Sequence, residues 1–342
     1  KGRCRNVSPF FCDLNIRMLK TAKELLQKKY NLIDMDQFVL GDRQPRELEK
    51  ATDKKAQTIL YSEENIEFLQ ERDIQVFKDL VEVNKNICVL AHGVNKDFPF
   101  EFINHFDFWI QLRQLNSKAE PITHDMTKPK DFLFLSRRET ELRGLLRDKL
   151  TETGCLNNSI ISYDRGDRGI KHLEKQYEHI SFFDTNFKAV NCHYKPAIWQ
   201  VLPQQFANTK YSIVAETIET NGVHCMSEKI FKPIIAGHIF IALAGSGYLN
   251  YLRQCGFKTF HDYIDESYDM EKDPIKRVEK IVLSCQDLKS RNHIELYKQI
   301  EHITKHNRTL FFNEQHLRHL NMHILNKVEK YFKDVERSKT KL

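Results

Sequence analysis

Blocks of apolar residues alternate with polar stretches along this chain, and the sharpest alternation lies in its second half. The apolar run from Tyr211 to Ala215 contains β-branched residues and has the length of a strand that is buried on both faces. After a polar loop, Ser227 stands at the N-cap position of a predicted helix over 228–236, and Gly237 marks its predicted end. The pattern therefore predicts a strand followed by a short helix.

A second apolar run at 238–243 and a glycine turn at 244–247 come next, and another helix is predicted after them. Together these elements predict a β-α-β-α unit, in which ligands bind outside the carboxyl ends of the parallel strands. Helix N-termini point their free N–H groups into the same crevice. We therefore expect the following residues to face one cleft: Glu216, Ser227, Glu228, Lys229, Gly245 and Ser246.

Glu228 and Lys229, in the first turn of the predicted helix, are candidates for ligand binding. An ammonium group at a helix N-terminus opposes the helix dipole, so Lys229 at this position favours a nearby anion such as a phosphate. Glu228 beside it can accept hydrogen bonds from the paired hydroxyls of a ribose. The alternative is that both residues are ordinary solvated side chains of a first helical turn.

The rest of the chain has a similar rhythm. Apolar runs at 58–61, 86–91 and 107–111 alternate with polar helical stretches, which predicts an α/β fold with a mainly parallel sheet in the first half. The polar segment 118–130 carries two prolines and is the predicted linker between two domains. We expect a first domain over 1–117, a second domain over 131–310, and a C-terminal helix within 311–342 that packs back toward the first domain.

A predicted strand at 131–135 leads into a helix that has Arg143 in its first turn. At this position a guanidinium can reach a diphosphate that is held above the helix N–H groups. Arg137 and Arg138 lie in the loop before this helix and are further candidates. Each of these two could equally face water.

The order of these features resembles the donor-binding half of the α-1,3-fucosyltransferase family. The shared series is a strand, Glu216, a variable loop, Ser-Glu-Lys-Ile-Phe at 227–231 and an Ala-Gly-His strand entry at 236–238. The resemblance covers roughly 132–260 and fades toward the amino terminus. It implies a GT-B fold, in which two Rossmann-like domains bind a sugar nucleotide between them. It also implies that Arg143 contacts the donor phosphates and that the transfer inverts the sugar by a single displacement.

The composition fits a two-domain protein with an anionic ligand. The chain has 342 residues, of which 41% are hydrophobic, and its formal net charge of +6 favours a negatively charged ligand. No apolar run approaches the ~20 residues that span a bilayer. The eight cysteines form no C-x-x-C pair, and we interpret them as reduced thiols of a cytoplasmic protein.

Several common cofactor signatures are absent from the sequence. No G-x-G-x-x-G follows a predicted strand and no G-x-x-x-x-G-K-[ST] is present, which disfavours dinucleotide oxidoreductases and P-loop NTPases. Metal-dependent sugar transferases carry an Asp-x-Asp sequence at a strand end. Asp34-Met35-Asp36 comes before the apolar run 38–40, so we expect no such sequence at a strand end. We therefore expect neither a metal ion nor any cofactor besides the sugar nucleotide. A metal site is also disfavoured on one predicted helical face, where no acid is in register with three histidines: His316, His319 and His323.

Glycosyl transfer also needs a base that takes a proton from the acceptor hydroxyl. We expect a carboxylate or histidine of the first domain, at a strand end that faces the cleft. The stretch after the apolar run 86–91 supplies the catalytic candidates His92, Asp97 and Glu101. A first strand is predicted over 7–12, and the fourth candidate, Asp13, follows it. No motif chooses among these four residues.

The sequence therefore predicts a glycosyltransferase that moves a sugar from a nucleoside-diphosphate sugar to a hydroxyl acceptor. The acceptor is either a saccharide or a hydroxymethylated base in DNA, since a lysine-rich chain without membrane features is compatible with both. A sugar-nucleotide epimerase of the same fold and a non-catalytic sugar-nucleotide-binding module are alternatives. The sequence leaves the oligomeric state open.

Overall fold

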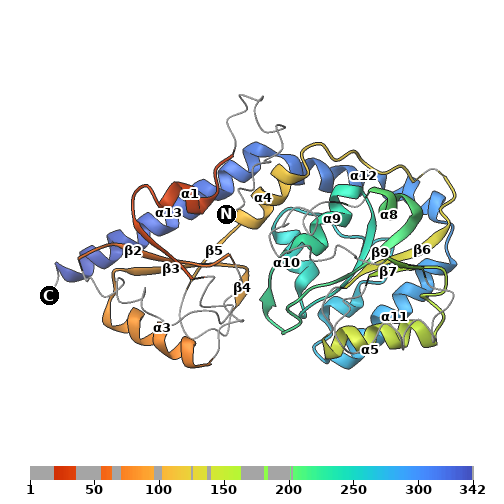
Figure 1. The fold of residues 1–342 in the computed structure, drawn as a ribbon, viewed down its shortest axis with the longest axis horizontal. Helices are drawn as coiled ribbons and strands as arrows, with labels where there is room; N and C mark the ends of the chain where they lie inside the picture. The colour runs from red at the N-terminus through yellow and green to blue at the C-terminus, as the bar shows by residue number, and fades with distance from the viewer. Residues whose placement is uncertain are drawn as a thin grey trace, which may run out of the picture.

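The computed structural model describes residues 19–35, 55–63, 71–95, 102–124, 126–136, 140–162, 181–183, 201 and 203–340. These residues form two lobes, each built on a parallel sheet with helices packed against it (Figure 1). The predicted α/β class is confirmed. Two sheet-based lobes and a C-terminal helix that returns to the first lobe match the predicted GT-B arrangement.

The first lobe contains a four-stranded sheet in the order β1-β2-β3-β5. Its strands all run parallel: β1 (Asn31–Asp34), β2 (Thr58–Tyr61), β3 (Ile87–His92) and β5 (Ile103–His105). β2 and β3 are buried along their whole length, which explains why their sequences are nearly continuous apolar runs. Side chains of α3 (Glu71–Val83) pack on one set of strand residues, and those of α1 (Ala22–Leu26) and α13 (Glu314–Lys339) pack on the other.

The apolar run at 107–111 contributes no strand to this sheet. It begins α4 (Asp107–Leu115), in which the buried residues Trp109, Ile110 and Leu112 recur at helical spacing. The strand before it, β5, has only three residues and gives no clear apolar pattern. The expectation of a strand at 107–111 is wrong because a short apolar run fits a buried helix turn as well as a strand.

The position of Asp34-Met35-Asp36 also differs from the expectation. Asp34 is the last residue of β1, so this sequence begins at the end of a strand. β1 is short, and Leu32 and Ile33 are its only two apolar residues, which is too few for the pattern to reveal a strand. The Asp34 carboxylate forms an ion pair with Lys23.

The second lobe contains a five-stranded sheet in the order β11-β9-β6-β7-β8. Its strands also all run parallel: β6 (Lys130–Leu135), β7 (Ile160–Ser162), β8 (Ser181–Phe183), β9 (Thr209–Ala215) and β11 (Ile239–Leu243). The chain moves from β6 outward through β7 and β8, then returns to the other side of β6 with β9. The strand order reverses between β6 and β9, and open α/β sheets bind their ligands at such a switch point.

Two groups of helices pack against this sheet. α5 (Glu141–Glu152) packs on α11 (Pro274–Ser290), whereas α9 (Glu228–Ala236) packs on both α8 (Pro203–Asn208) and α12 (His293–Phe312). Figure 1 shows the two groups on opposite faces of the sheet.

The predicted boundaries of α9 are confirmed. Ser227 caps the helix by accepting a 3.2 Å hydrogen bond from the backbone N–H of Lys229. Gly237 ends it in the left-handed conformation, with φ +73°, which glycine adopts without steric cost. The cap residue and the stop residue therefore place Glu228 and Lys229 in the first turn, as the sequence predicts.

Contacts from paired strands, packed side chains and a long helix join the lobes. β4 (Val94–Asn95) of the first lobe pairs antiparallel with β10 (Val223–His224) of the second lobe. The indole of Trp109 on α4 packs on the ring of Phe231 on α9, with 5.5 Å between the ring centroids. α13 follows α12 and runs along the first lobe to the C-terminus (Figure 1).

Two further features of the described residues bear on the expectations from composition. None of the helices within the described ranges combines the length and the apolar character that crossing a bilayer requires. The cysteines that the structure describes all carry free thiols: Cys88, Cys155, Cys225, Cys255 and Cys285.

The glycine turn between β11 and α10 (Tyr248–Gln254) passes very close to the loop that follows β9. A Cβ atom on Gly245 would lie 2.0 Å from the carbonyl oxygen of Thr220 and 3.2 Å from that of Val223. At the same place the Asn221 side chain accepts a 3.1 Å hydrogen bond from the backbone N–H of Ser246. The close approach of two backbone segments therefore requires glycine at position 245.

We expect Gly245→Ala to destabilise the protein, because the turn or the loop after β9 must move to admit the methyl group. The free energy of unfolding should fall by about 1–3 kcal/mol, as for other overpacking substitutions. Urea unfolding curves measure this change. Ser246→Ala is the matched control, since it keeps the backbone hydrogen bond to Asn221. Equal stability of Gly245→Ala and the wild type would contradict the prediction.

Candidate functional site

The candidate site lies at the carboxyl ends of β6 and β9, where the strand order of the second sheet reverses. β9 ends at Ala215 and is followed by Glu216, and β6 leads into α5 through the N-cap residue Thr140. Neighbouring parallel strands end at the same edge of a sheet, so the side chains that follow them lie close together.

Glu216 is buried behind the start of α9, with 3% of its surface exposed. One carboxylate oxygen accepts a 2.8 Å hydrogen bond from the Tyr248 hydroxyl, and the other accepts one from the Ser227 hydroxyl. Burial raises the pKa of Glu216, while the Lys229 charge and these hydrogen bonds act in the opposite direction. Glu216 thus anchors the first residues of two helices, and its oxygens already have donors.

Glu228 and Lys229 form an ion pair at the start of α9, with 3.1 Å between the Lys229 Nζ and a Glu228 carboxylate oxygen. Their side chains are only 17% and 19% exposed, so neither is a solvated first-turn residue. Burial lowers the pKa of Lys229, but the carboxylates of Glu228 and Glu216 outweigh burial and raise it above the usual value. Lys229 is therefore a firmly protonated cation.

Arg143 points from α5 toward the end of β9, and 3% of its surface is exposed. Its guanidinium donates a 2.8 Å hydrogen bond to the carbonyl oxygen of Ala215 and a weak 3.5 Å one to the Thr217 hydroxyl. Its Nε lies 3.8 Å from Glu219, which also accepts a 2.8 Å hydrogen bond from Thr140. The sequence predicts the position of Arg143 in the first turn, and the structure adds that the side chain clamps β9 to α5.

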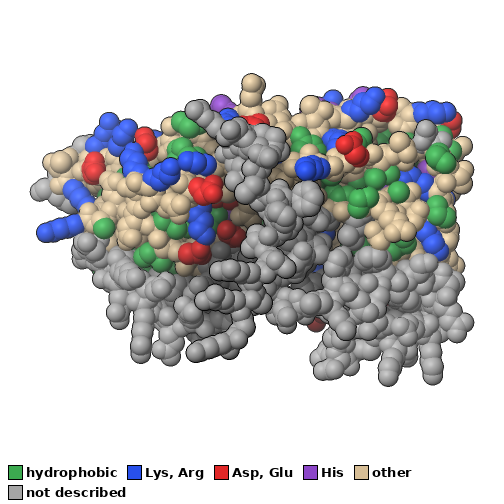
Figure 2. Space-filling view, turned by 45° about the horizontal axis from the view of Figure 1, so that its top comes forward, with side chains coloured by type: hydrophobic (Ala, Val, Ile, Leu, Met, Phe, Trp, Pro, Cys, Tyr) green, Lys and Arg blue, Asp and Glu red, His purple; other side chains and the backbone are tan. Residues whose placement is uncertain are grey.

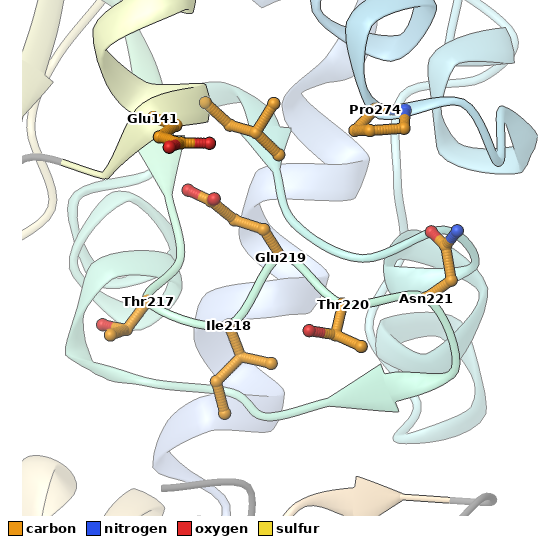
Figure 3. Close-up of a pocket in the computed structure, with 8 residues that line it drawn as sticks. Glu141, Thr217, Ile218, Glu219, Thr220, Asn221 and Pro274 are labelled. Atoms are coloured by element: carbon orange, nitrogen blue, oxygen red, sulfur yellow. The ribbon is translucent and has the colours of Figure 1, made fainter.

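An open pocket of about 630 Å³ lies beside this cluster. Its walls come from the loop after β9 and from the first residues of α5 and α11: Glu141, Leu142, Thr217, Ile218, Glu219, Thr220, Asn221 and Pro274. Figure 3 shows the carboxylates of Glu141 and Glu219 directed into the same space. Thr217 lines the pocket and contacts Arg143, so the pocket adjoins the charged cluster.

Gly245 and Ser246 lie on the far side of the loop after β9, next to Asn221. The helix that follows them, α10, offers fewer free N–H groups than the sequence suggests. The Asp269 carboxylate accepts hydrogen bonds from Leu249 N at 2.7 Å and from Asn250 N at 3.2 Å. An acid from a later segment thus occupies the place of a bound anion at this helix start. Binding of a donor by Gly245 and Ser246 stays a prediction.

Arg277 on α11 is an organising residue that the sequence analysis misses. It is 1% exposed, and its guanidinium donates to the carbonyl oxygens of Ala244 and Glu271, at 2.7 and 2.9 Å, and to the Asn221 side chain. It therefore ties the glycine turn to the pocket loop. The sequence could have indicated that Arg277 is buried, because it lies on one helical face, at i, i+4, i+7 and i+11, with three buried residues: Ile281, Ser284 and Leu288.

His92 is the one candidate base that the described residues include. It is 4% exposed at the end of β3, and its Nε2 donates a 2.9 Å hydrogen bond to the carbonyl oxygen of Met226, directly before Ser227. Burial and the neighbouring His105 lower the pKa of His92 to about 4. His92 therefore connects the first lobe to the segment that carries Ser227, Glu228 and Lys229. The remaining candidates lie outside the described residues: Asp13, Asp97, Glu101, Arg137 and Arg138.

No group of three or more His, Cys, Asp or Glu side chains in the described ranges is arranged to hold a metal ion. His316, the first of the three histidines on α13, packs its ring on the indole of Trp109, with 5.7 Å between the centroids. This contact gives His316 a structural role at the junction of the lobes.

Comparisons with known proteins find similarity at the level of solved structures. No protein-family model matches it, and no curated protein matches it. A solved structure described as "OtsA apo structure" is similar at a TM-score of 0.44 and 10% sequence identity, over 90% of this chain and 75% of that chain. The strand orders given above define the fold of the chain independently of this similarity.

We expect acid to destabilise the protein through His92 and His105, because burial lowers the pKa of each to about 4. Between the unfolded value of about 6.5 and pH 4, the unfolded chain binds more protons than the folded chain. The stability is therefore complete above pH 6.5 and falls as the pH decreases toward 4. Each histidine can contribute up to about 3 kcal/mol to this loss.

Chemical denaturation at pH 7 and pH 5 measures the effect. His92→Gln keeps a donor for Met226 but does not titrate, so its stability should depend less on pH than that of the wild type. His302→Gln, at an exposed position of α12, is the control and should leave the dependence unchanged. An unaltered pH dependence in His92→Gln would show that His92 is not a buried neutral group in the folded protein.

Proposed function

We propose that this protein is a glycosyltransferase that uses a nucleoside-diphosphate sugar as donor. The observation that carries the proposal is the convergence of Arg143, Glu228 and Lys229 at the switch point of the second sheet. Nucleotides bind at such switch points, with phosphates at helix N-termini. The adjoining pocket supplies room and polar groups for the rest of a donor.

The groups present suit the departure of a diphosphate. When the bond between the anomeric carbon and the diphosphate oxygen breaks, that oxygen keeps the electron pair and the negative charge grows there. Lys229 and the first-turn N–H groups of α9 can stabilise this charge, and each well-placed donor is worth roughly 3 kcal/mol of barrier. We also propose that cationic side chains carry out this role without a metal ion, and that Glu228 accepts hydrogen bonds from ribose hydroxyls.

The proton of the acceptor hydroxyl has to pass to a base as the new glycosidic bond forms. His92 does not suit this role in its present position, since only 4% of its surface is exposed and its Nε2 donates to Met226. We therefore assign the base to one of the three remaining candidates: Asp13, Asp97 or Glu101. Inversion of the sugar, by one displacement, remains part of the proposal on the strength of the fucosyltransferase resemblance.

A saccharide is the acceptor that we propose. Figure 2 shows Lys and Arg side chains on both lobes of this face, with Asp and Glu among them. DNA binding favours Lys and Arg side chains that are clustered in a basic patch or stripe, whereas the described side chains on this face mix both signs of charge. A hydroxymethylated DNA base remains the alternative acceptor.

The proposal is tested by the binding of GDP, UDP, ADP and CDP, each with and without magnesium, in thermal-shift and calorimetric titrations. A ligand that binds only the folded state raises the melting temperature. Binding of one nucleoside diphosphate without magnesium is expected. Release of that diphosphate from its sugar conjugate, in the presence of an oligosaccharide acceptor, then distinguishes a transferase from a module that only binds. Failure of all four nucleotides to bind would contradict the proposal.

We expect Lys229→Gln to weaken nucleoside diphosphate binding 10- to 100-fold, because it removes a charge-assisted hydrogen bond worth about 1.5–3 kcal/mol. Lys298→Gln is the matched control, since Lys298 is 66% exposed and, among the described residues, pairs only with Glu295 on the outside of α12. Arg143 is unsuitable for this test because its removal leaves the carbonyl of Ala215 without that donor and Glu219 without its cationic partner. Equal affinity of Lys229→Gln and the wild type would place the site elsewhere.

A further inference from the structure

Tyr248 is the first residue of α10, and its side chain reaches the carboxylate that lies behind the start of α9. Only 2% of its surface is exposed, and its hydroxyl donates a 2.8 Å hydrogen bond to Glu216. Burial and the charge of Glu216 raise the pKa of Tyr248, so the hydroxyl keeps its proton and acts as the donor. The sequence analysis does not single out Tyr248, because 32 positions separate it from Glu216.

Glu216 connects Tyr248 to Ser227. The oxygen that accepts the Tyr248 hydrogen bond lies 3.4 Å from the backbone nitrogen of Ser227, and the other oxygen accepts from the Ser227 hydroxyl. An ionised carboxylate only accepts hydrogen bonds, whereas a hydroxyl has one proton to donate and two lone pairs. The Ser227 proton therefore points to Glu216, and the Ser227 lone pairs are left for other donors.

Lys229 supplies two such donors. Its backbone N–H donates to Ser227 Oγ at 3.2 Å, and its Nζ lies 3.4 Å from the same oxygen. The ammonium group also pairs with a Glu228 carboxylate oxygen at 3.1 Å. Two acceptors thus hold the ammonium group, and the lone pairs of Ser227 face it because Glu216 accepts the Ser227 proton.

We propose that Tyr248 is a positioning residue of the donor site, which acts on Lys229 through Glu216 and Ser227. The inference rests on the proposed function, because it concerns the cation that stabilises the diphosphate. In this role Tyr248 does not need to contact the ligand. Its hydroxyl offsets part of the cost of removing the Glu216 carboxylate from water. Without this donor the carboxyl group takes up a proton more readily, and a protonated carboxyl group can donate to Ser227 and turn its hydroxyl away.

This role makes ligand binding depend on pH. Burial raises the pKa of Glu216, while the Lys229 charge and the hydrogen bonds that the carboxylate accepts lower it. Removal of the Tyr248 donor therefore raises the pKa further, so the ionised carboxylate is lost at a higher pH than in the wild type as the pH falls. The ionisable groups that act on Glu216 come from α9 and α10: Lys229, Glu228 and Tyr248. Arg143 of α5 acts on the neighbouring Lys229.

Calorimetric titrations of the intact chain with inorganic pyrophosphate, GDP, UDP, ADP and CDP test this inference. Tyr248→Phe removes only the hydroxyl, and at about pH 7 it should weaken binding roughly 3- to 10-fold. The ratio of its dissociation constant to that of the wild type should grow as the pH falls from about 8 to about 6. The titration of the ligand phosphates is the same for every variant, so it does not affect this ratio.

Tyr297→Phe is the matched control. Its hydroxyl is also buried in the second lobe, but it lies at the amino ends of the strands, where it donates to Lys210 O at 2.7 Å and accepts from Ile239 N at 2.9 Å. This variant should unfold more easily than the wild type and still bind with wild-type affinity at every pH. A change that only loosens the lobe is thereby separated from a change at the site.

A double-mutant cycle shows whether Tyr248 acts through Glu216. Glu216→Gln keeps the shape of the side chain but cannot ionise, so it should weaken binding at least about 10-fold. Addition of Tyr248→Phe to Glu216→Gln should then change the affinity by less than about twofold, since coupled residues of one network are not additive. If Glu216→Gln does not fold, the pH series of Tyr248→Phe decides alone.

Three results would overturn the inference. The first is an affinity of Tyr248→Phe within about twofold of the wild type at each pH, which is too small for a lost hydrogen bond to a charged group. The second is a loss in Tyr248→Phe that is equal at all pH values. The third is a double variant in which the two single losses multiply.

The outcomes also separate this inference from the proposed function. Nucleotide binding that does not depend on Tyr248 leaves the proposed function standing and removes the inference. Pyrophosphate binding that depends on Tyr248, without binding of any nucleoside diphosphate, supports the inference and removes the proposed function. Binding of neither ligand contradicts both.

Discussion

The buried carboxylate of Glu216 is the group on which the arrangement of the site depends. A carboxylate inside a protein has to be surrounded by donors, because its removal from water is otherwise very costly. The chain supplies these donors from Ser227 and Tyr248, which stand at the starts of α9 and α10. The first residues of both helices therefore lie near the end of β9. The first turn of α9, with Glu228 and Lys229, is held in one place at the switch point of the sheet for this reason.

The loop that follows β9 forms part of the pocket and also contacts the first lobe. Its first part, 217–221, forms a wall of the pocket, and its second part, Val223–His224, pairs with β4 of the first lobe. Arg143 holds the beginning of the loop from the side of α5, and Arg277 holds Asn221 from the side of α11. Because both guanidinium groups are almost fully buried, the loop is fixed before any ligand binds. Preorganisation of this kind lowers the entropic cost of binding.

Local patterns were sufficient to predict the central elements, whereas contacts between distant segments were not. β9, α9 and β11 follow from two apolar runs, a cap at Ser227 and a stop at Gly237, all of which act within a few residues. The first-turn position of Arg143 follows from the same kind of signal. The direction of the Arg143 side chain toward Ala215, 72 positions away, cannot be predicted from such local signals. The position of His92 against Met226, 134 positions away, depends on the packing of the two lobes and could not be read from the sequence either.

Hydrogen exchange of the whole chain, with and without a nucleoside diphosphate, tests most directly the claim that the ligand binds at the switch point. Ligand contacts and reduced local opening slow the exchange of the amides around a site. The account predicts slower exchange in 217–232 and in the first turn of α5, with little change in α3 on the first lobe. Ligand-dependent protection that is confined to the first lobe, or that spares 217–232, would contradict it.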